Sequence, residues 1–134
     1  MRYFILCSFL FVLTGCDILW NIFGPPKDDQ FIVKRVYPHA IENTAVQGLN
    51  IAFQVVCVVG DPCWFPSHNE FATKNNGQDI YVSVYAKRDK KAVCPQVISI
   101  IKPIVKYSVK TVGEYRFHFW KSDTTTMDTT IVVR

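Results

Sequence analysis

The stretch Gly113-Glu114-Tyr115-Arg116-Phe117-His118-Phe119-Trp120 has the most regular pattern in the chain. Aromatic residues stand at every second position from Tyr115 to Phe119, and polar residues stand between them. Because the side chains of a β-strand point alternately to its two faces, this pattern predicts a strand with one buried face and one face in solvent. Residues 80–87 alternate in the same way. These strands decide the fold, because each needs a second layer to cover its apolar face.

The period-two pattern extends over most of the chain after residue 30, in short runs at intervals of about 10 residues. The closest helical rival, residues 97–109, has Pro103 in its middle. We therefore expect an all-β fold, an antiparallel β-sandwich of seven to eight strands. Pro38 ends the first strand, and residues 43–48 are typical of a turn. The predicted strands are residues 31–37, 49–59, 63–65 with 70–74, 80–87, 97–101, 104–109, 113–120 and 129–133.

A short apolar leader precedes the predicted sandwich. It contains Arg2 and an apolar run, and it closes with Leu13-Thr14-Gly15-Cys16. About 11 apolar residues are too few for a helix that spans a bilayer, which takes about 20, so we interpret residues 1–15 as a signal peptide. Residues 16–30 include Gly24-Pro25-Pro26 and have the composition of a tether. Residues 31–134 then form the only domain for which the chain has room.

Leu13-Thr14-Gly15-Cys16 resembles the lipobox of bacterial lipoproteins. The resemblance implies that Cys16 is joined to diacylglycerol and becomes the first residue after the leader is cut. Several acyl chains at one residue would give a stable membrane anchor. The expected location is then the bacterial cell envelope, and Asp17 leaves open which membrane is used. A plain secreted protein is the alternative.

A second resemblance concerns the domain. Val112-Gly113-Glu114-Tyr115 resembles the Gly-x-Tyr corner of immunoglobulin-like sandwiches. Cys63-Trp64-Phe65, the turn at Gly77, residues 80–85, Ala92-Val93-Cys94 and the Gly-x-Tyr corner together resemble small uncharacterised bacterial lipoproteins that carry one such domain. This resemblance implies an immunoglobulin-like fold and an envelope location, and it carries no shared activity.

Three cysteines, Cys57, Cys63 and Cys94, lie in the predicted domain. Exported domains of this size usually oxidise their cysteines, and three cysteines allow one bridge. Cys63 and Cys94 both lie at strand edges, and the similar lipoproteins have a cysteine at each place, so we expect a Cys63–Cys94 disulfide. Cys57 would then be a small buried apolar group. A bridge between Cys57 and Cys63, across the Gly60-Asp61-Pro62 turn, is the alternative.

The sequence contains no pattern that favours a metal, a cofactor or a catalytic group. The spacing of Cys57, Cys63 and His68 does not match common zinc sites. A Cys63 nucleophile with His68 or His118 as its base would need an activated thiol, which nothing in the sequence indicates. Asp123 and Asp128 lack the dense acidic spacing of calcium loops. We therefore expect no catalytic residue and no cofactor.

The formal net charge is +4, and one basic cluster, Lys87-Arg88-Asp89-Lys90-Lys91, stands out. We interpret this cluster as a solvated loop; a patch for anionic lipid or nucleic acid is the weaker hypothesis, and export argues against nucleic acid. The expected function is a non-enzymatic binding or structural module with an envelope protein or extracellular ligand as its partner. Trp64 and Phe65, beside a turn, are the candidate contact residues. The alternative is an envelope thiol enzyme or redox protein that uses Cys57 or Cys63.

Overall fold

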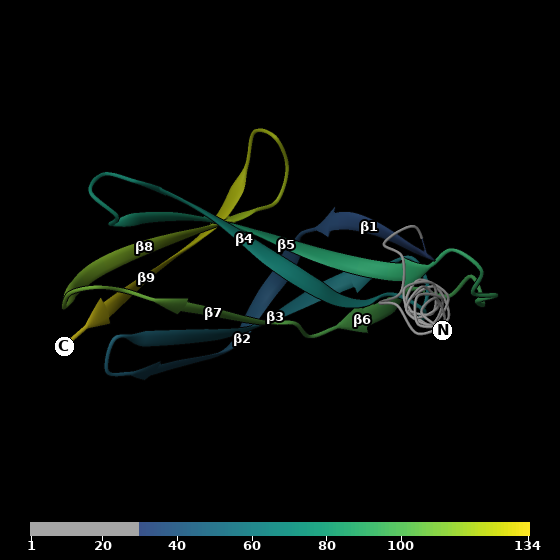
Figure 1. Cartoon of the computed structure of the whole chain (residues 1–134), viewed down its shortest axis with the longest axis horizontal. Helices are drawn as coiled ribbons and strands as arrows, with labels where there is room; N and C mark the ends of the chain where they lie inside the picture. The colour runs from purple at the N-terminus through teal and green to yellow at the C-terminus, as the bar shows by residue number, and fades with distance from the viewer. Residues whose placement is uncertain (1–29) are drawn as a thin grey trace, which may run out of the picture.

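The computed structural model describes residues 30–134, and these residues contain nine strands in two sheets. The predicted signal peptide, the lipidation site at Cys16 and nearly all of the tether lie outside the described residues. The five-stranded sheet contains β1 (Phe31–Val36), β4 (Phe65–Lys74), β5 (Asp79–Asp89), β8 (Gly113–Trp120) and β9 (Thr126–Val133). The four-stranded sheet contains β2 (Pro38–Gln47), β3 (Asn50–Val59), β6 (Ser99–Ile101) and β7 (Ile104–Ser108), and Figure 1 shows both sheets.

The β-sandwich prediction is confirmed, since the described chain is almost entirely strand and folds into two sheets. In the part of the chain that is described, no helix is long and apolar enough to cross a membrane. The long strands expected from their alternation, β3, β5 and β8, are all present and lie inside their sheets.

One pairing differs from the expected antiparallel arrangement. β5 and β8 are parallel, with Asp79 opposite Arg116 and Val82 opposite Phe119. The reason is the path between them: after β5 the chain runs back through β6 and β7 in the other sheet, so β8 starts at the same end as β5 (Figure 1). β1 pairs with the remaining length of the same edge of β5, from Val84 to Asp89.

Residues 39–47 were expected to be a loop and a turn, but they form most of β2. This strand pairs with β3 through two register irregularities, between Pro38 and Ala40 and between Ile41 and Asn43. β2 is an edge strand; eight of its ten residues are exposed, and only half of the ten are polar. An exposed, irregular edge strand lacks the alternation by which strands are recognised in a sequence.

The core lies between the two sheets and is closed by aromatic side chains. Phe53 of β3 meets Phe117 and Phe119 of β8 at ring-centroid distances of 4.8 and 5.4 Å, both edge to face. All three side chains are fully buried, which confirms the predicted inward face of β8. Other fully buried residues include Ile51, Val55, Ile80, Val82, Val84 and Val105.

The predicted corner before β8 is present. The hydroxyl of Tyr115 donates a 2.7 Å hydrogen bond to the carbonyl oxygen of Thr111, four residues upstream. Gly113 has a φ of 148°, a conformation that favours glycine. This hydrogen bond fixes the connection between β7 and β8 against the end of the core, as in the tyrosine corner of immunoglobulin-like sandwiches.

Candidate functional site

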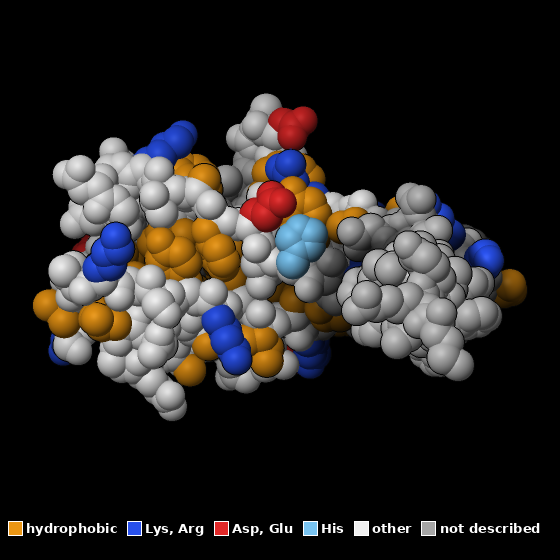
Figure 2. Space-filling model, viewed as in Figure 1, with side chains coloured by type: hydrophobic (Ala, Val, Ile, Leu, Met, Phe, Trp, Pro, Cys, Tyr) orange, Lys and Arg blue, Asp and Glu red, His pale blue; other side chains and the backbone are white. Residues whose placement is uncertain are grey.

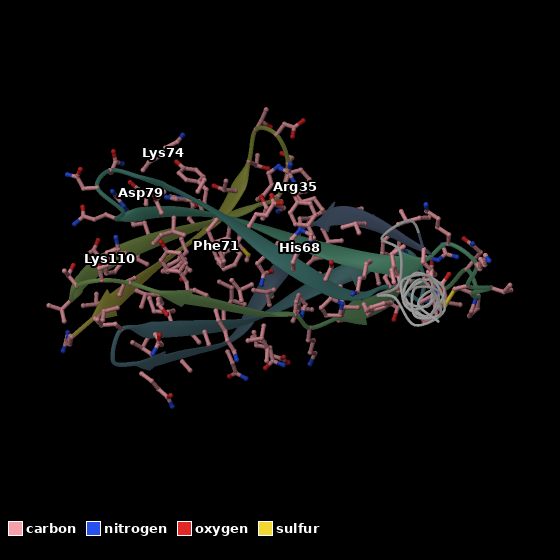
Figure 3. The ribbon with its side chains drawn as sticks, in the orientation of Figure 1. Arg35, His68, Phe71, Lys74, Asp79 and Lys110 are labelled. Atoms are coloured by element: carbon pink, nitrogen blue, oxygen red, sulfur yellow. A yellow bond between two sulfur atoms is a disulfide. The ribbon has the colours of Figure 1, made fainter. Side chains whose placement is uncertain are left out.

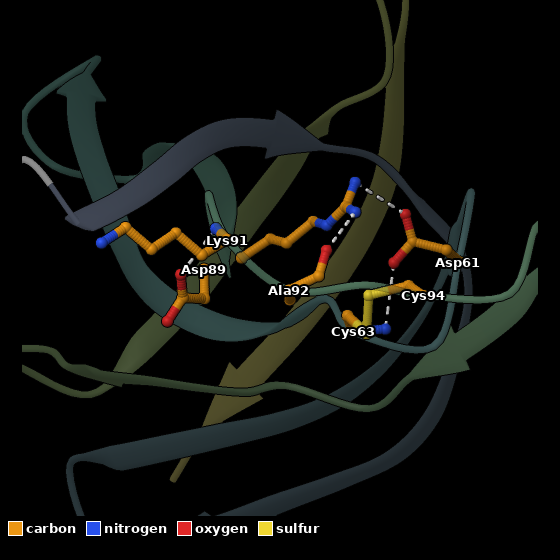
Figure 4. Close-up of a disulfide and its surroundings, with 7 residues drawn as sticks. Asp61, Cys63, Asp89, Lys91, Ala92 and Cys94 are labelled. Atoms are coloured by element: carbon orange, nitrogen blue, oxygen red, sulfur yellow. Dashed lines mark hydrogen bonds and ion pairs between the residues drawn. A yellow bond between two sulfur atoms is a disulfide. The ribbon is translucent and has the colours of Figure 1, made fainter.

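A disulfide joins Cys63, just before β4, to Cys94 in the connection between β5 and β6. The pairing agrees with the expected one, and among the described residues 30–134 Cys57 is the free cysteine. Figure 4 shows the polar groups around the bridge. Asp61 accepts a 3.0 Å hydrogen bond from the backbone N–H of Cys63 and forms a 3.1 Å ion pair with Arg88. Although Asp61, Cys63 and Cys94 lie close together, both sulfur atoms are used in the disulfide and the carboxylate is paired, so this cluster is not a metal site.

The two cysteines of the thiol alternative do not have the properties of nucleophiles. Cys63 is oxidised in the bridge, and Cys57 is fully buried in β3. Burial raises the pKa of Cys57 to about 12, so its thiol stays protonated at neutral pH. His68 is exposed on β4, and the sulfur of Cys63 is bonded to Cys94, so Cys57, Cys63 and His68 do not form a zinc site either.

The two candidate contact residues, Trp64 and Phe65, have different environments. Trp64 is only 9% exposed and belongs to the core, with the Lys34 ammonium 4.2 Å from its ring centroid. Phe65 is 39% exposed and packs edge to face against Phe31 at 6.0 Å. Phe65 is therefore at the surface, while Trp64 has no free face for a ligand.

Phe65 lies at one end of a larger surface that the sequence patterns do not reveal. The outer face of the five-stranded sheet carries aromatic and cationic side chains from β1, β4, β5 and β8, and we call it the aromatic face. Its members are Arg35, His68, Tyr81, Tyr85, His118 and Trp120.

The rings of the aromatic face are ordered by stacking. His68 lies flat on Tyr85, with a centroid distance of 4.6 Å and an interplanar angle of 4°. The guanidinium of Arg35 lies 4.5 Å from the ring centroid of Trp120 and 5.9 Å from that of Tyr85. Figure 3 labels Arg35 and His68, which come from β1 and β4 on opposite sides of β5. Tyr85 also donates a 3.0 Å hydrogen bond to Glu70.

At the other end of this face, His118 is held between two carboxylates. Its Nε2 lies 2.9 Å from Oδ1 of Asp79, and its Nδ1 lies 2.8 Å from Oδ1 of Asp128. Arg116 makes two further contacts of 2.8 Å with Asp79, one to each carboxylate oxygen. Tyr81 stacks on the His118 ring at 4.7 Å.

These hydrogen bonds shift the pKa values of all three groups. Burial lowers the pKa of His118, but the hydrogen bonds to Asp79 and Asp128 outweigh burial and raise it above its ordinary value of 6.5. Hydrogen bonds from His118 and Asn75 lower the pKa of Asp79, and those from Thr126 and His118 lower the pKa of Asp128. Each ring nitrogen of His118 lies within hydrogen-bond distance of a carboxylate, so neither is free to bind a metal, and only the protonated ring can donate to both carboxylates at once.

The alternation of β8 predicts that His118 points outward, but it carries no information about the partners of the ring. Asp79 and Asp128 lie in turns or strand ends, where acidic residues are common and carry no special signal. Asp79 reaches His118 because of the parallel pairing of β5 with β8, whereas Asp128 lies directly opposite His118 in the antiparallel pairing of β8 with β9. The available signal was the outward register of β5, with Tyr81 and Tyr85 where polar residues are usual on a solvent face.

The fold and this surface define a disulfide-linked β-sandwich domain with an aromatic outer face. The chain belongs to the ORF11 beta-sandwich domain family, whose sequence model matches residues 53–131, from within β3 to near the end of β9. Comparisons with curated proteins and with solved structures found no match.

Proposed function

We propose that this protein is a lipid-anchored lipoprotein of the bacterial cell envelope whose sandwich domain binds a partner, without catalysis, through the aromatic face. The observation that carries the binding proposal is the array of exposed and half-buried rings with Arg35 among them. Tyr, Trp and Arg are enriched at the centres of protein interfaces, and Tyr and Trp supply large contact areas with few rotatable bonds.

The order of these side chains supports binding rather than simple solvation. His68, Tyr85, Arg35 and Trp120 hold one another by stacking, so they lose little conformational freedom when a partner covers them. Phe65 extends the surface at one end, with the Lys87 ammonium 5.3 Å from its ring centroid. The partner class is an envelope protein or an extracellular ligand.

The anchor is proposed from the leader and from Cys16. The disulfide supports export, because structural disulfides persist in oxidising compartments. Intact mass of the protein extracted from its native membrane tests the anchor: we expect a chain that starts at Cys16 and carries acyl groups. A chain without acyl groups contradicts the anchor and leaves the binding proposal standing on the aromatic face alone.

Site-specific photo-crosslinking tests the binding face. Ser83 lies between Tyr81 and Tyr85 on β5, so a photoreactive phenylalanine at this position in intact cells should crosslink to a discrete partner. Arg35→Ala or Trp120→Ala should abolish that product. The matched control has the photoreactive phenylalanine in place of Lys106, which is exposed on β7 of the other sheet. No product at position 83, or the same products at both positions, contradicts the proposal.

A further inference from the structure

The end of the domain where the chain enters carries exposed aliphatic side chains together with lysines, a combination that the aromatic face lacks. Gln30 is tied to the end of β5: its carbonyl oxygen accepts a 3.0 Å hydrogen bond from the backbone N–H of Lys90, and its side chain donates one to Asp89. The entry point of the tether therefore lies beside the connection between β5 and β6, at the right-hand end of Figure 1.

Four apolar side chains in and just after this connection are strongly exposed. Val93 is 99% exposed, Ile98 75%, Val97 61% and Ile100 57%. Ile100 also lies opposite Val58, which is 36% exposed, on the outer surface of the four-stranded sheet. Exposed apolar residues that occur singly need no explanation, but several within one short segment mark a contact surface.

Basic side chains flank these apolar residues. Lys90 and Lys91 are exposed three and two positions before Val93, whereas Lys102, two positions after Ile100, is already paired with Glu42 at 2.8 Å. The neighbouring carboxylates are bonded within the domain: Asp89 accepts hydrogen bonds from Gln30 and from the backbone of Lys91, and Asp61 is paired with Arg88. At the right-hand margin of Figure 2, hydrophobic and Lys or Arg side chains are visible beside the residues drawn in grey. A surface with both basic and apolar side chains can bind a bilayer of anionic lipids, because the basic groups contact the headgroups and the apolar groups contact the hydrocarbon beneath them.

The connection is also held in shape before any contact is made. Cys94 is bonded to Cys63, and Arg88 donates a 3.2 Å hydrogen bond to the carbonyl oxygen of Ala92 (Figure 4). Val93 lies between these two fixed points. A preformed loop loses less conformational entropy when it binds than a flexible one does.

We propose that this end of the domain, residues 90–100, rests on an anionic phospholipid surface, with Val93 and Ile98 at the level of the headgroups and Lys90 and Lys91 beside the lipid phosphates. This inference deepens the proposed function, since it rests on a membrane anchor at Cys16 that brings the entry point close to a bilayer. It directs the opposite end of the domain, which contains the turn between β4 and β5, away from the membrane.

Fluorescence of the anchored full chain in vesicles tests this contact. Ile98→Cys carries an environment-sensitive fluorophore. Cys57 is buried, Cys63 and Cys94 are bonded to each other, and Cys16 carries the lipid in the anchored chain, so the label reacts at position 98; an unacylated chain is labelled with Cys16→Ser added. We expect a blue shift in phosphatidylcholine vesicles that contain phosphatidylglycerol, and none in phosphatidylcholine alone. The matched control is a label at Val132→Cys, exposed on β9, which should not shift in either vesicle. An unshifted label at position 98, or equal shifts at both positions, overturns the inference.

Charge variants test the role of the lysines. At about 1 kcal/mol for each lysine near an anionic surface, Lys90→Gln with Lys91→Gln should reduce the ratio of contacting to free orientations about 30-fold. An unchanged blue shift in this variant contradicts the electrostatic contact. Flotation of the protein with the vesicles and its intact mass report the anchor separately. An anchored protein without the shift refutes the contact alone, and an unacylated chain whose label still shifts on added vesicles refutes the anchor alone.

Discussion

Single residues of the aromatic face make the domain sensitive to pH. The pKa of His118 is raised in the folded state, so its stabilising effect is fully present below about 6.5, its ordinary value, and is lost as the pH rises through the folded value. Asp79 and Asp128 have lowered pKa values, so their effect is present above 3.8 and is lost as the pH falls through the folded values. Arg116 is the other charged group bound to Asp79.

We therefore expect His118→Gln to lower the free energy of unfolding more at pH 6 than at pH 9. Urea unfolding of the wild type and the variant at both pH values measures the difference. Asp128→Asn removes one of the two carboxylates that face the ring, so it should reduce the pH dependence of the wild type. A difference between wild type and His118→Gln that grows towards pH 9 would show that the ring is held neutral in the folded protein.

Tyr115 gives a second prediction at the scale of one residue. Tyr115→Phe keeps the ring in the core but removes the hydroxyl that bonds to the Thr111 carbonyl. The loss of one partly buried hydrogen bond should lower the free energy of unfolding by about 1 kcal/mol. Urea unfolding measures it, with Tyr107→Phe as the control, because Tyr107 packs on Phe71 and Phe117 through its ring. If both variants lower the free energy of unfolding by the same amount, the hydrogen bond from Tyr115 to Thr111 makes no specific contribution to stability.

Residues on regular strands could be assigned from the sequence, and others could not. Tyr115, Phe117 and Phe119 face the core as expected, because strict alternation leaves one choice. Trp64 and Phe65 adjoin a turn, where the alternation is interrupted, so only the structure shows that Trp64 is inside and Phe65 outside. The contact of His118 with Asp79 joins residues 39 positions apart, and this pair has no local signature.

At the scale of elements, the disulfide covalently joins the connection between β3 and β4 to the connection between β5 and β6, across 31 positions of sequence. In the chain-entropy description, closing a loop of this length stabilises the fold by about 3 to 4 kcal/mol. The Cys63→Ala, Cys94→Ala variant should lose about this much free energy of unfolding in urea. A reducing agent should destabilise the wild type and leave the variant unchanged; a wild type that is insensitive to reduction would contradict the prediction.

The elements also show where sequence patterns stop being informative. β3, β5 and β8 could be predicted because each is long, half-buried and bounded by turn residues. β2 could not, because its exposed edge position removes the apolar face. The parallel pairing of β5 with β8 depends on the path through β6 and β7, which no pattern within either strand encodes.

At the scale of the whole molecule, the sandwich could be predicted from the sequence, whereas its proposed orientation rests on side-chain exposure seen only in the structure. Two sheets could be predicted, because half-buried strands must cover one another. The basic cluster of residues 87–91 was interpreted from sequence as a solvated loop, since the exposed Val93 and Ile98 beside the entry point were not apparent without the structure. Together the two proposals would give a domain with one end on lipid and one broad face turned to a partner.

The pairing of β1 with β5 has a mechanical consequence. The chain passes from Gln30 directly into β1, which runs antiparallel to β5 from Phe31 opposite Asp89 to Val36 opposite Val84. A pull between the tether and a partner held on β5 acts along these two strands. The interstrand hydrogen bonds then share the force as a shear load, instead of opening one after another as in a zipper. With the proposed anchor and the proposed binding face, β1 would be the strand that bears tension between the bilayer and a bound partner.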